Sequence, residues 1–552
     1  LTWLTDEPVW VDQWPLRGDR LLALNALIDE QLQKGRIVPS TSPWNSPIFV
    51  VKKNGKWRLV HDLRKINAVI EPMGAVQPGM PSPTMVPQGF DIVVIDIKEC
   101  FFQIPISKKD SPRFAFTVPS VNQQEPAKRF QWTVLPQGMR NSPTICQNVV
   151  AKVLLAVRRS FPEALVYHYM DDILVAAESN DTLDLLVQNT IAALTKFGFE
   201  LSPEKIQKTS PWKYLGCRVS QKIITPEHIS INKKINTLHD LQVLLGKINW
   251  IRPTLKITTD QLSPLFTLLK GDSSLTSPRR LTDEAKSALR LVEAATRRAF
   301  TNRRWKDIPP SLFVLKGEHQ PFAVIGQFNE ITKTVNLWEW VFLSHQFPKT
   351  IVTLPEMLAQ LRGKARNRIW ELTAMDPKII YLPITQSVLA HLLQFNINFQ
   401  AALADYTRIV SIHYPKTPVL QFFGEVQIYP EPLYSSVPLE DAMTVFTVGS
   451  GNTGKLWSAG RWEHDIHQVQ GSPQVAELSA VLRAFQLFKQ SLNIVSDSKY
   501  VVGVVQRLEN AYLKEINHPV LAHLFRSLLM VIHARDNKFF ICHIRSHTHL
   551  PG

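Results

Sequence analysis

The chain has 552 residues, far more than one hydrophobic core can organise, so we expect several folding units. Hydrophobic residues make up 45% and charged residues 20%, an ordinary balance that excludes wholesale disorder. The formal net charge of +15 favours a polyanionic partner, above all a nucleic acid backbone, with an acidic membrane surface as the second choice.

The cysteines are widely separated and form no CxxC pair: they are Cys100, Cys146, Cys217 and Cys542. This spacing argues against a disulfide framework and a zinc knuckle, and it fits a reducing compartment. No apolar run approaches the ~20 residues that cross a bilayer, and the start LTWLTDEPVW resembles neither a signal peptide nor an initiator terminus. We expect an intracellular protein cut from a longer precursor, with no membrane partner.

The first clear element in chain order is SPIFVVKKNGKWRLVHDLR, in which two strand-like runs flank Asn54-Gly55. This dipeptide supports the positive φ angles of a type I′ turn and predicts a β-hairpin. The arms carry five basic residues: Lys52, Lys53, Lys56, Arg58 and Arg64. A solvated basic edge explains them as readily as a binding surface does.

Strands and helices alternate over the next 140 or so residues. FDIVVIDIKECFFQIPI predicts a strand that ends at Asp96, and RFAFTVPSV and KRFQWTVLPQGM predict two more. Ser142 as N-cap, followed by Pro143, predicts a helix to about Arg159. Its predicted apolar face comprises Ile145, Val149, Val153 and Leu154. ALVYHYMDDILVAAE reads as two apolar runs joined by an acidic turn, and DTLDLLVQNTIAALTKFG as a helix that ends at Gly198.

The second half of the chain has three regions of different character. Lysines are dense from about 205 to 256, and LHDLQVLLGKINWI there predicts a helix whose Lys247, Asn249 and Trp250 could follow a backbone. Residues 302–439 mix strands and helices without a catalytic constellation, so we expect a spacer or docking domain. From Asp441, AMTVFTVGSG, VAELSAVLRAFQLFKQ and LNIVSDSKYVV predict a separate α/β unit.

Asp96, Asp171 and Asp172 are the candidate catalytic carboxylates. Nucleotidyl transfer uses two divalent cations with oxygen ligands, and aspartates at the ends of adjacent strands hold such ligands rigidly. A lone Asp at a strand end is more often a turn residue. Two successive carboxylates within an apolar hairpin point to a cation, because without one their repulsion costs stability.

Five ordered segments resemble motifs of retroviral reverse transcriptases, most closely those of the betaretrovirus and endogenous K-type group. They are WNSPIFVVKKNGKWRLVHDLR from Trp44, VIDIKECFFQIP around Asp96, LPQGMRNSPTICQ from Leu135, YMDD at 169–172 and YLG at Tyr214. PVWVDQWPL and HIRSHTHLPG extend the resemblance to both ends of the chain. It implies an α+β right-hand polymerase followed by an α/β RNase H-like domain.

The resemblance also implies a division of the chain into named parts. We expect fingers at 1–71 and 104–141, palm at 72–103 and 142–222, thumb at 223–304, connection at 305–440, and a truncated RNase H-like domain at 441–552.

The implied activity is RNA- and DNA-directed DNA polymerisation with two Mg²⁺ ions, or Mn²⁺ as a substitute. The implied partners are a primed RNA or DNA template, dNTPs and a second subunit in a homo- or heterodimer. Asp96 and Asp171 would ligate the metals and Asp172 would support them. Lys53 and Arg58 would neutralise the incoming triphosphate.

Other roles follow from the same resemblance. Phe101 would exclude a ribose 2′-OH, unless it is a core aromatic with Phe102 on the opposite face of a strand. Gln137 would contact the nucleotide and template region. The primer grip would comprise Tyr214, Leu215 and Gly216. Glu99 stands where the family commonly has a second Asp, at a position expected to act through its backbone.

The RNase H-like part matches its family incompletely. Glu477 and Asp497 stand at two of the four carboxylate positions, but Val448 occupies the first, and valine cannot ligate a cation. His547 resembles the family's flexible histidine, and no final Asp follows it. We expect no RNA cleavage.

Zinc is a competing interpretation of the C-terminal segment, which contains Cys542, His543, His547 and His549. We reject it because neighbours in a strand face opposite sides and the paired spacings of structural sites are missing.

Two rival functions remain open. One is a degenerate endogenous remnant, or a scaffold subunit, that binds nucleic acid without catalysis. The other is an RNA-copying RNA polymerase, which Phe101 and the trailing RNase H-like unit disfavour.

Overall fold

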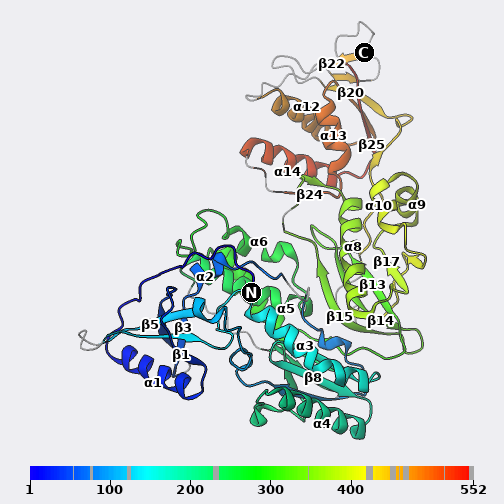
Figure 1. Cartoon of the computed structure of the whole chain (residues 1–552). Coiled ribbons are helices and arrows are strands. Elements are labelled where there is room, and N and C mark those ends of the chain that lie inside the picture. The colour runs from blue at the N-terminus through cyan, green and yellow to red at the C-terminus, as the bar shows by residue number, and fades with distance from the viewer. Residues whose placement is uncertain are drawn as a thin grey trace. The chain divides into compact units, whose positions relative to one another are not determined.

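We describe a computed structural model of the chain, whose colours run from the N- to the C-terminus in Figure 1. The described residues are 1–53, 55–74, 79–120, 126–227, 235–345, 347–417, 420, 427–447, 456–458, 461–463, 472–514, 516 and 518–545. The chain divides into two compact units, Leu1–Glu227 and His228–Gly552, and each is described by itself.

The N-terminal part of the first unit contains helices α1 (Asp19–Gln33) and α2 (Arg64–Val69) and a three-stranded antiparallel sheet. In order across the sheet, its strands are β1 (Ile37–Pro39), β6 (Lys128–Trp132) and β5 (Ala115–Val118). The predicted hairpin is confirmed as β2 (Ile48–Lys53) paired with β3 (Lys56–His61). Gly55 has φ +79°, whereas Asn54 lies outside the described residues, so the turn type stays a prediction.

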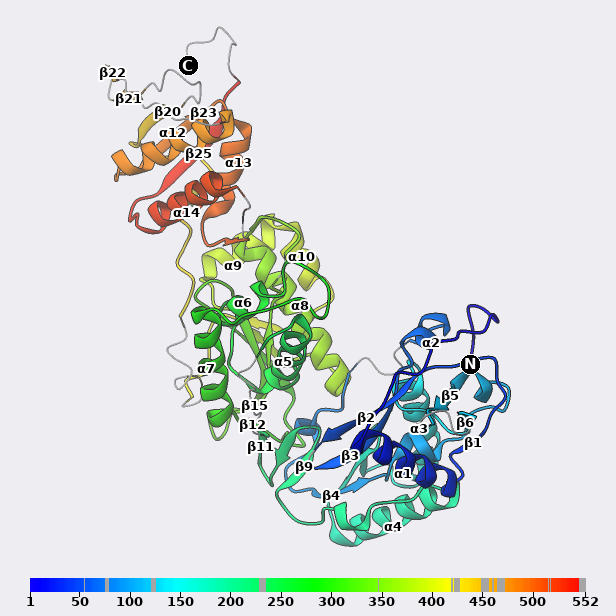
Figure 2. The ribbon, with the colours of Figure 1, turned by 90° about the vertical axis from the view of Figure 1, so that its left-hand side faces the viewer.

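A second antiparallel sheet follows the order β4 (Asp91–Asp96), β8 (Asp172–Ala177) and β7 (Leu165–Tyr169). Helices α3 (Ser142–Ser160) and α4 (Asn180–Phe197) pack on each other and on this sheet, as Figure 2 shows from the side. Because side chains alternate along a strand, the sheet has two apolar faces. One face meets α3 and α4 through Val93, Ile95, Ile173 and Val175. The other meets β9 (Trp212–Tyr214), β10 (Cys217–Val219) and β11 (Ile223–Pro226) through Ile92, Val94, Leu174 and Ala176.

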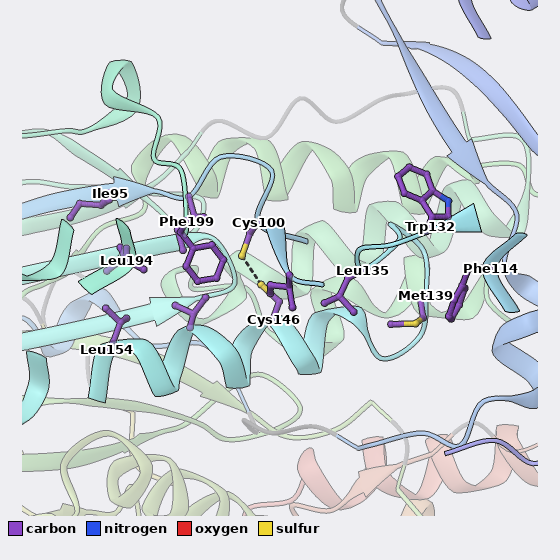
Figure 3. Close-up of a cluster of buried hydrophobic side chains, with 14 of the residues drawn as sticks. Ile95, Cys100, Phe114, Trp132, Leu135, Met139, Cys146, Leu154, Leu194 and Phe199 are labelled. Atoms are coloured by element: carbon purple, nitrogen blue, oxygen red, sulfur yellow. Dashed lines mark hydrogen bonds between the residues drawn. The ribbon is translucent and has the colours of Figure 1, made fainter. Parts of the chain in front are cut away.

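One continuous core joins these parts of the first unit. Figure 3 shows it running from Ile95, Leu154 and Leu194 near the second sheet to Trp132 of the first sheet and Phe114, which directly precedes β5. The Sγ atoms of Cys100 and Cys146 lie 2.8 Å apart within it, where a short 3₁₀ helix packs on α3. The strands that carry the candidate carboxylates therefore share one rigid core with the β1-β6-β5 sheet.

Three details of the predicted helices and strands are wrong. Helix α3 begins at Ser142 itself, with Asn141 as N-cap, because the turn before it already has helical backbone angles. Its fully buried stripe contains Cys146, Val150, Leu154 and Val157, since these face β7 and α4, and the predicted Ile145, Val149 and Val153 lie half-buried at its margin. Phe101 and Phe102 lie in the 3₁₀ helix Cys100–Gln103 and not on opposite faces of a strand. The end of α4 at Gly198, with φ +103°, is confirmed.

The second unit begins with three helices around a small core: α5 (Leu238–Ile251), α6 (Thr259–Thr267) and α7 (Asp283–Arg298). Helix α5 confirms the predicted apolar stripe. The side chain of Thr237 accepts from the backbone N–H of Asp240, and the Asp240 carboxylate accepts from the backbone N–H of Thr237. These two bonds form a capping box.

Two mixed sheets complete the second unit. The first has strand order β15 (Thr334–Phe342), β14 (Phe322–Asn329), β13 (Pro310–Leu315), β17 (Ile379–Tyr381) and β18 (Ile409–Ser411). Its helices are α8 (Leu354–Thr373), α9 (Gln386–Phe395) and α10 (Ile397–Leu403). The second has the order β19 (Tyr434–Ser435), β25 (Phe539–His543), β23 (Leu492–Ser496) and β20 (Met443–Thr447).

The predicted C-terminal α/β arrangement is confirmed. Helices α12 (Pro473–Leu487), α13 (Lys499–Leu508) and α14 (Pro519–His533) pack with the β19-β25-β23-β20 sheet around their own core. A short antiparallel pair, β16 (Ile351–Val352) with β24 (Tyr512–Leu513), ties this part to the preceding sheet. Over the described residues, every helix is too short or too polar to cross a membrane.

Candidate active site

The register of β4 and β8 brings the candidate carboxylates together. Asp96, the last residue of β4, stands opposite Asp172, the first residue of β8, and Asp171 lies in the turn just before it. The backbone N–H of Ile97 donates to the Asp171 carbonyl over 3.0 Å, which fixes the turn beside the end of β4. By alternation, Asp96 and Asp172 share the sheet face that carries Val94 and Leu174, the face opposite α3 and α4.

Hydrogen bonds with Gln147 of α3 hold the turn between β7 and β8. Met170 has φ +55°, a left-handed conformation that is costly for a residue other than glycine. Its N–H donates to the Gln147 side-chain oxygen over 2.7 Å, and the Gln147 amide donates to the His168 carbonyl over 3.4 Å. Gln147 is 5% exposed, so solvent does not compete for these bonds.

His168 connects the same turn to the far end of α3. Burial lowers the pKa of His168, so the ring is neutral and its Nδ1 accepts from the Arg158 guanidinium over 2.9 Å. Its Nε2 then donates to the Gln147 carbonyl over 3.2 Å. Arg158 also donates twice to the Val166 carbonyl, at 3.1 Å each. Helix α3 thus fixes β7 on both sides of His168.

Asp96 has two side-chain partners from a segment that runs beside β4. The Ser202 hydroxyl donates to Oδ1 over 3.0 Å, and the Lys205 ammonium pairs with the same oxygen over 2.7 Å. The segment is held by backbone bonds in both directions between Val94 and Gln207. The Asp96 side chain is 17% exposed, so its rotamer is set by these contacts.

The three carboxylates share an excess of negative charge. Burial raises the pKa of Asp172 to about 6, and the neighbouring charges of Asp171 and Asp96 add to the rise. Burial also raises the pKa of Asp171, with a smaller contribution from Asp96. The hydrogen bond to Asp96 raises the pKa of Lys205, so this ammonium stays charged and offsets part of the excess.

No three His, Cys, Asp or Glu side chains converge closely enough to hold a metal ion together within the described part of the chain. At Asp96 the position of a cation is taken by Lys205. The residues nevertheless fit divalent cations, because carboxylate oxygens are the ligands that hard cations prefer and because burial beside Asp96 raises the pKa of both Asp171 and Asp172.

The candidate nucleotide contacts lie on other elements of the first unit. Arg58 is exposed on β3, opposite Val51, while the side chain of Lys53 lies outside the described residues. Gln137 is exposed in a turn whose Gly138 has φ +93° and would place a Cβ 3.6 Å from the His61 carbonyl. This turn therefore packs closely against the base of the β2-β3 hairpin.

Phe101 lies directly after Cys100 in the 3₁₀ helix, half-buried against the core. Phe102 is a core aromatic, since it stacks on Trp132 with ring centroids 5.2 Å apart. Glu99 has φ +46°, and its carboxylate accepts from Arg36 over 2.7 Å. Its side chain is thus also engaged, where we expected the backbone to matter most.

The predicted primer grip is a tight hairpin turn between β9 and β10. Leu215 and Gly216 occupy the turn with φ +47° and +75°. Tyr214 is 2% exposed and its hydroxyl has no hydrogen-bond partner among the described residues, so its side chain faces the core. Burial raises the pKa of Tyr214, with a further contribution from the charge of Asp172. Only the turn residues are placed to meet a ligand.

The two predicted nuclease carboxylates lie at one end of the C-terminal sheet. Asp497 follows β23, and Glu477 on α12 accepts from the Ser498 hydroxyl over 2.5 Å. Val448 and His547 lie outside the described residues. Cys542 and His543 are the last residues of β25, and the other two residues of the rejected zinc set, His547 and His549, are outside the described part.

Sequence reasoning missed three residues around the carboxylates: Gln147, Ser202 and Lys205. Lys205 was noted only as the start of a lysine-dense stretch, and nothing in its neighbourhood pointed to Asp96. A polar residue within the buried stripe of α3 was the one available signal for Gln147.

Family comparisons agree with this arrangement. Residues 50–219 match the family described as reverse transcriptase (RNA-dependent DNA polymerase), and 226–290 match the reverse transcriptase thumb domain. Residues 318–420 match an ERVK-8-like, RNaseH-like domain, and 440–552 match RNase H. These matches identify a reverse transcriptase polymerase region with its thumb domain, followed by an RNase H domain.

Individual relatives that match the chain include betaretroviral Gag-Pro-Pol polyproteins. The chain is 43% identical to the Gag-Pro-Pol polyprotein of mouse mammary tumor virus (strain BR6), 41% to that of squirrel monkey retrovirus and 39% to that of sheep pulmonary adenomatosis virus. Each match covers 100% of this chain and 30% to 32% of the polyprotein. The chain thus spans about a third of the length of these relatives.

The charge excess predicts that Asp172→Asn stabilises the metal-free protein. Because the folded-state pKa of Asp172 is raised to about 6 from 3.8, its destabilising charge is absent below about pH 4 and complete above about pH 6. In EDTA at pH 8, we expect the variant to gain about 1 to 2 kcal/mol, since each pKa unit is worth ~1.4 kcal/mol and partial exposure reduces the sum. Urea unfolding of the variant and the unmodified chain at pH 4.5 and pH 8 measures this difference in the free energy of unfolding.

The exposed Asp184→Asn on α4 is the matched control and should change little at either pH. A stabilisation by Asp172→Asn that is equal at both pH values, or larger at the lower one, would contradict the account.

The contacts of Gln147 predict a positioning role. Gln147→Ala removes the acceptor for the Met170 N–H, so we expect kcat of primer extension to fall at least tenfold while KM for dNTP changes less than threefold. The control is Asn45→Ala in the first unit, another buried amide, which donates to the Val11 carbonyl over 2.7 Å. The role is supported if Gln147→Ala and Asn45→Ala lose similar thermal stability but only Gln147→Ala loses kcat. It is refuted if both variants lose kcat to the same extent.

Proposed function

We propose that this chain is an RNA- and DNA-directed DNA polymerase that extends a primer 3′-OH with dNTPs by two-metal nucleotidyl transfer. The observation that carries the proposal is the meeting of Asp96, Asp171 and Asp172 at the paired ends of β4 and β8, within the segment that matches the reverse transcriptase family. Mg²⁺ is the proposed cation and Mn²⁺ a substitute.

The chain's own residues would divide the work. Bound divalent cations supply activation of the attacking hydroxyl and stabilisation of the triphosphate charge. Asp96 and Asp171 would hold them, with Asp172 adding negative charge beside them. Ser202 fixes the Asp96 rotamer and Gln147 fixes the turn that carries Asp171. Both ligands are thereby presented in one geometry before the substrate arrives.

The incoming nucleotide would be recognised by groups from other elements. Lys53 and Arg58 on the β2-β3 hairpin would neutralise the triphosphate, and Gln137 would border the nucleotide. Phe101 would exclude a ribose 2′-OH, which favours DNA over RNA synthesis. Its half-buried position, directly after the Cys100–Cys146 contact, supports this role because the ring cannot swing freely.

Helix α5 offers a surface for the template and primer. Its solvent face contains Val243, 44% exposed, Trp250, 42% exposed, and Lys247. A Cβ at Gly246 on the same face would meet no atom within 4 Å, so internal packing does not require glycine there. The close approach of an external backbone would require glycine there, and the net charge of +15 favours the phosphate backbone of a nucleic acid. The turn at Leu215 and Gly216 would grip the primer.

We further propose the seven-part division given above, from fingers at 1–71 to the RNase H-like domain at 441–552, and a chain that works in the virion core or host cell, alone or as a dimer. The compact first unit ends at Glu227 and the thumb match begins at 226, close to the proposed palm–thumb boundary.

We propose that the RNase H-like domain does not cleave RNA. Val448 stands where the first carboxylate would, and the Ser498 hydroxyl already occupies an oxygen of Glu477. Without a carboxylate at the position of Val448, a two-metal site lacks its shared ligand.

The polymerase proposal predicts that Asp171→Asn abolishes primer extension while template–primer binding changes less than threefold. The charge at the turn is lost, but the α5 surface and the hairpin are unchanged. Extension of a DNA primer on an RNA template with Mg²⁺, alongside filter binding of the same duplex, measures both effects. Asp184→Asn should extend like the unmodified chain.

Equal extension by Asp171→Asn and the unmodified protein would refute the assignment. No extension by either, with tight binding by both, would favour the scaffold function. Faster incorporation of NTPs than dNTPs would favour an RNA polymerase.

The nuclease proposal predicts no Mg²⁺-dependent cleavage of a labelled RNA/DNA hybrid. Asp497→Asn, purified in parallel, is the control for contaminating host nuclease. Cleavage that the unmodified chain shows and this variant lacks would sink the idea.

A further inference from the structure

We propose that a basic cavity in the second unit binds a small polyphosphate anion, at a site separate from the polymerase carboxylates. The cavity measures about 490 Å³. Its walls come from α6, from the segment after β15, and from β24 and α14, all labelled in Figure 1 except that segment. Its lining comprises Ser263, Thr267, Lys270, His345, Tyr512, Leu513, Lys514, Ile516, Ala522 and Arg526.

The walls are fixed to one another, so the cavity is a built feature. Strand β24 pairs with β16, and the Lys514 N–H donates to the Thr350 carbonyl over 2.9 Å. The Tyr512 ring lies 5.4 Å from that of Phe347. On the opposite wall, the Phe266 ring of α6 lies 5.1 Å from His345. Thr259 of α6 also donates to the Leu343 carbonyl over 2.8 Å.

The charge of the lining selects an anion. Lys270, Lys514 and Arg526 bring three positive charges to one cavity, and no carboxylate is among its described lining residues. An anion between these side chains would offset part of their positive charge. The Ser263 hydroxyl supplies a neutral hydrogen-bond donor for a phosphate oxygen, whereas the Thr267 hydroxyl donates to the Ser263 carbonyl over 3.0 Å.

The size of the cavity limits the anion. About 490 Å³ lies in the range of small-molecule sites, which is ~300 to 1,000 Å³. A nucleic acid duplex, roughly 20 Å wide, cannot enter such a space, whereas a triphosphate can. Arg526 offers a planar fork suited to two phosphate oxygens, and Lys514 offers a point charge beside it. The ligand class is therefore an oligophosphate, either inorganic or carried by a nucleotide.

Isothermal titration of the full chain with inorganic triphosphate tests the site. EDTA is included so that the polymerase carboxylates, without a cation, repel the ligand. We expect saturable one-to-one binding that Lys514→Gln and Arg526→Gln each weaken at least tenfold. Lys538→Gln, an exposed lysine beyond α14 in the same unit, is the matched control and should bind like the unmodified chain.

Parallel titrations with dATP and with a 5′-phosphorylated oligonucleotide distinguish the source of the phosphate. Triphosphate and dATP binding with equal affinity would show recognition of the phosphates alone, and tighter dATP binding would identify a nucleotide; both support the site. The proposal is overturned by the absence of saturable binding, by equal affinities in all variants, or by binding of the oligonucleotide alone. Because the readout is the loss of binding in Lys514→Gln and Arg526→Gln, two residues outside the polymerase site, these outcomes are independent of primer extension.

Discussion

The burial of three carboxylates at the paired ends of β4 and β8 is the constraint on which the first unit depends. Asp96 and Asp172 face each other because β4 and β8 pair in that register, and a shift of one residue would turn one of the two side chains to the face covered by α3 and α4. Packing on both faces of the sheet therefore stabilises an arrangement that electrostatics opposes. Burial raises the pKa of Asp172, and the charges of Asp171 and Asp96 add to the rise.

The surrounding contacts keep this arrangement ordered before any ligand binds. Gln147 holds Met170 in its left-handed conformation, His168 joins the same strand to Arg158, and Ser202 and Lys205 hold Asp96. These groups come from α3, from β7 and from the segment beside β4, and all are anchored in the continuous core of Figure 3. Stability lost at functional carboxylates is offset by packing elsewhere, as is usual for active sites.

The sequence was informative wherever local pattern decides structure. The carboxylate turn, the β2-β3 hairpin and the end of α4 at Gly198 follow from residues close together in the chain. Gln147, Ser202 and Lys205 could not be found this way, since the last two reach Asp96 across more than 100 residues. The buried face of α3 was misplaced because two neighbours, β7 and α4, jointly select it.

Comparison of the two sheets of the second unit explains why residues 302–439 show no catalytic constellation. In the first, the parallel neighbours β13 and β17 bring Phe313 opposite Tyr381, with ring centroids stacked 4.9 Å apart. In the second, the parallel neighbours β20 and β23 bring Thr447 opposite Ser496. Asp497 follows Ser496 directly, and the adjacent Ser498 donates to Glu477 of α12. A similar fold therefore carries an aromatic core in one place and a group of polar residues in the other, which shows that chemistry resides in the site and not in the fold.

The central claim is that the carboxylates at β4 and β8 form a working polymerase site. Its most direct measurement is incorporation of labelled dTTP by the unmodified full chain on a poly(rA) template with an oligo(dT) primer, with Mg²⁺ titrated from zero. We expect extension that requires Mg²⁺ and reaches a plateau as the Mg²⁺ concentration rises. Extension that is unchanged by EDTA, or no extension at any Mg²⁺ or Mn²⁺ concentration, would contradict it.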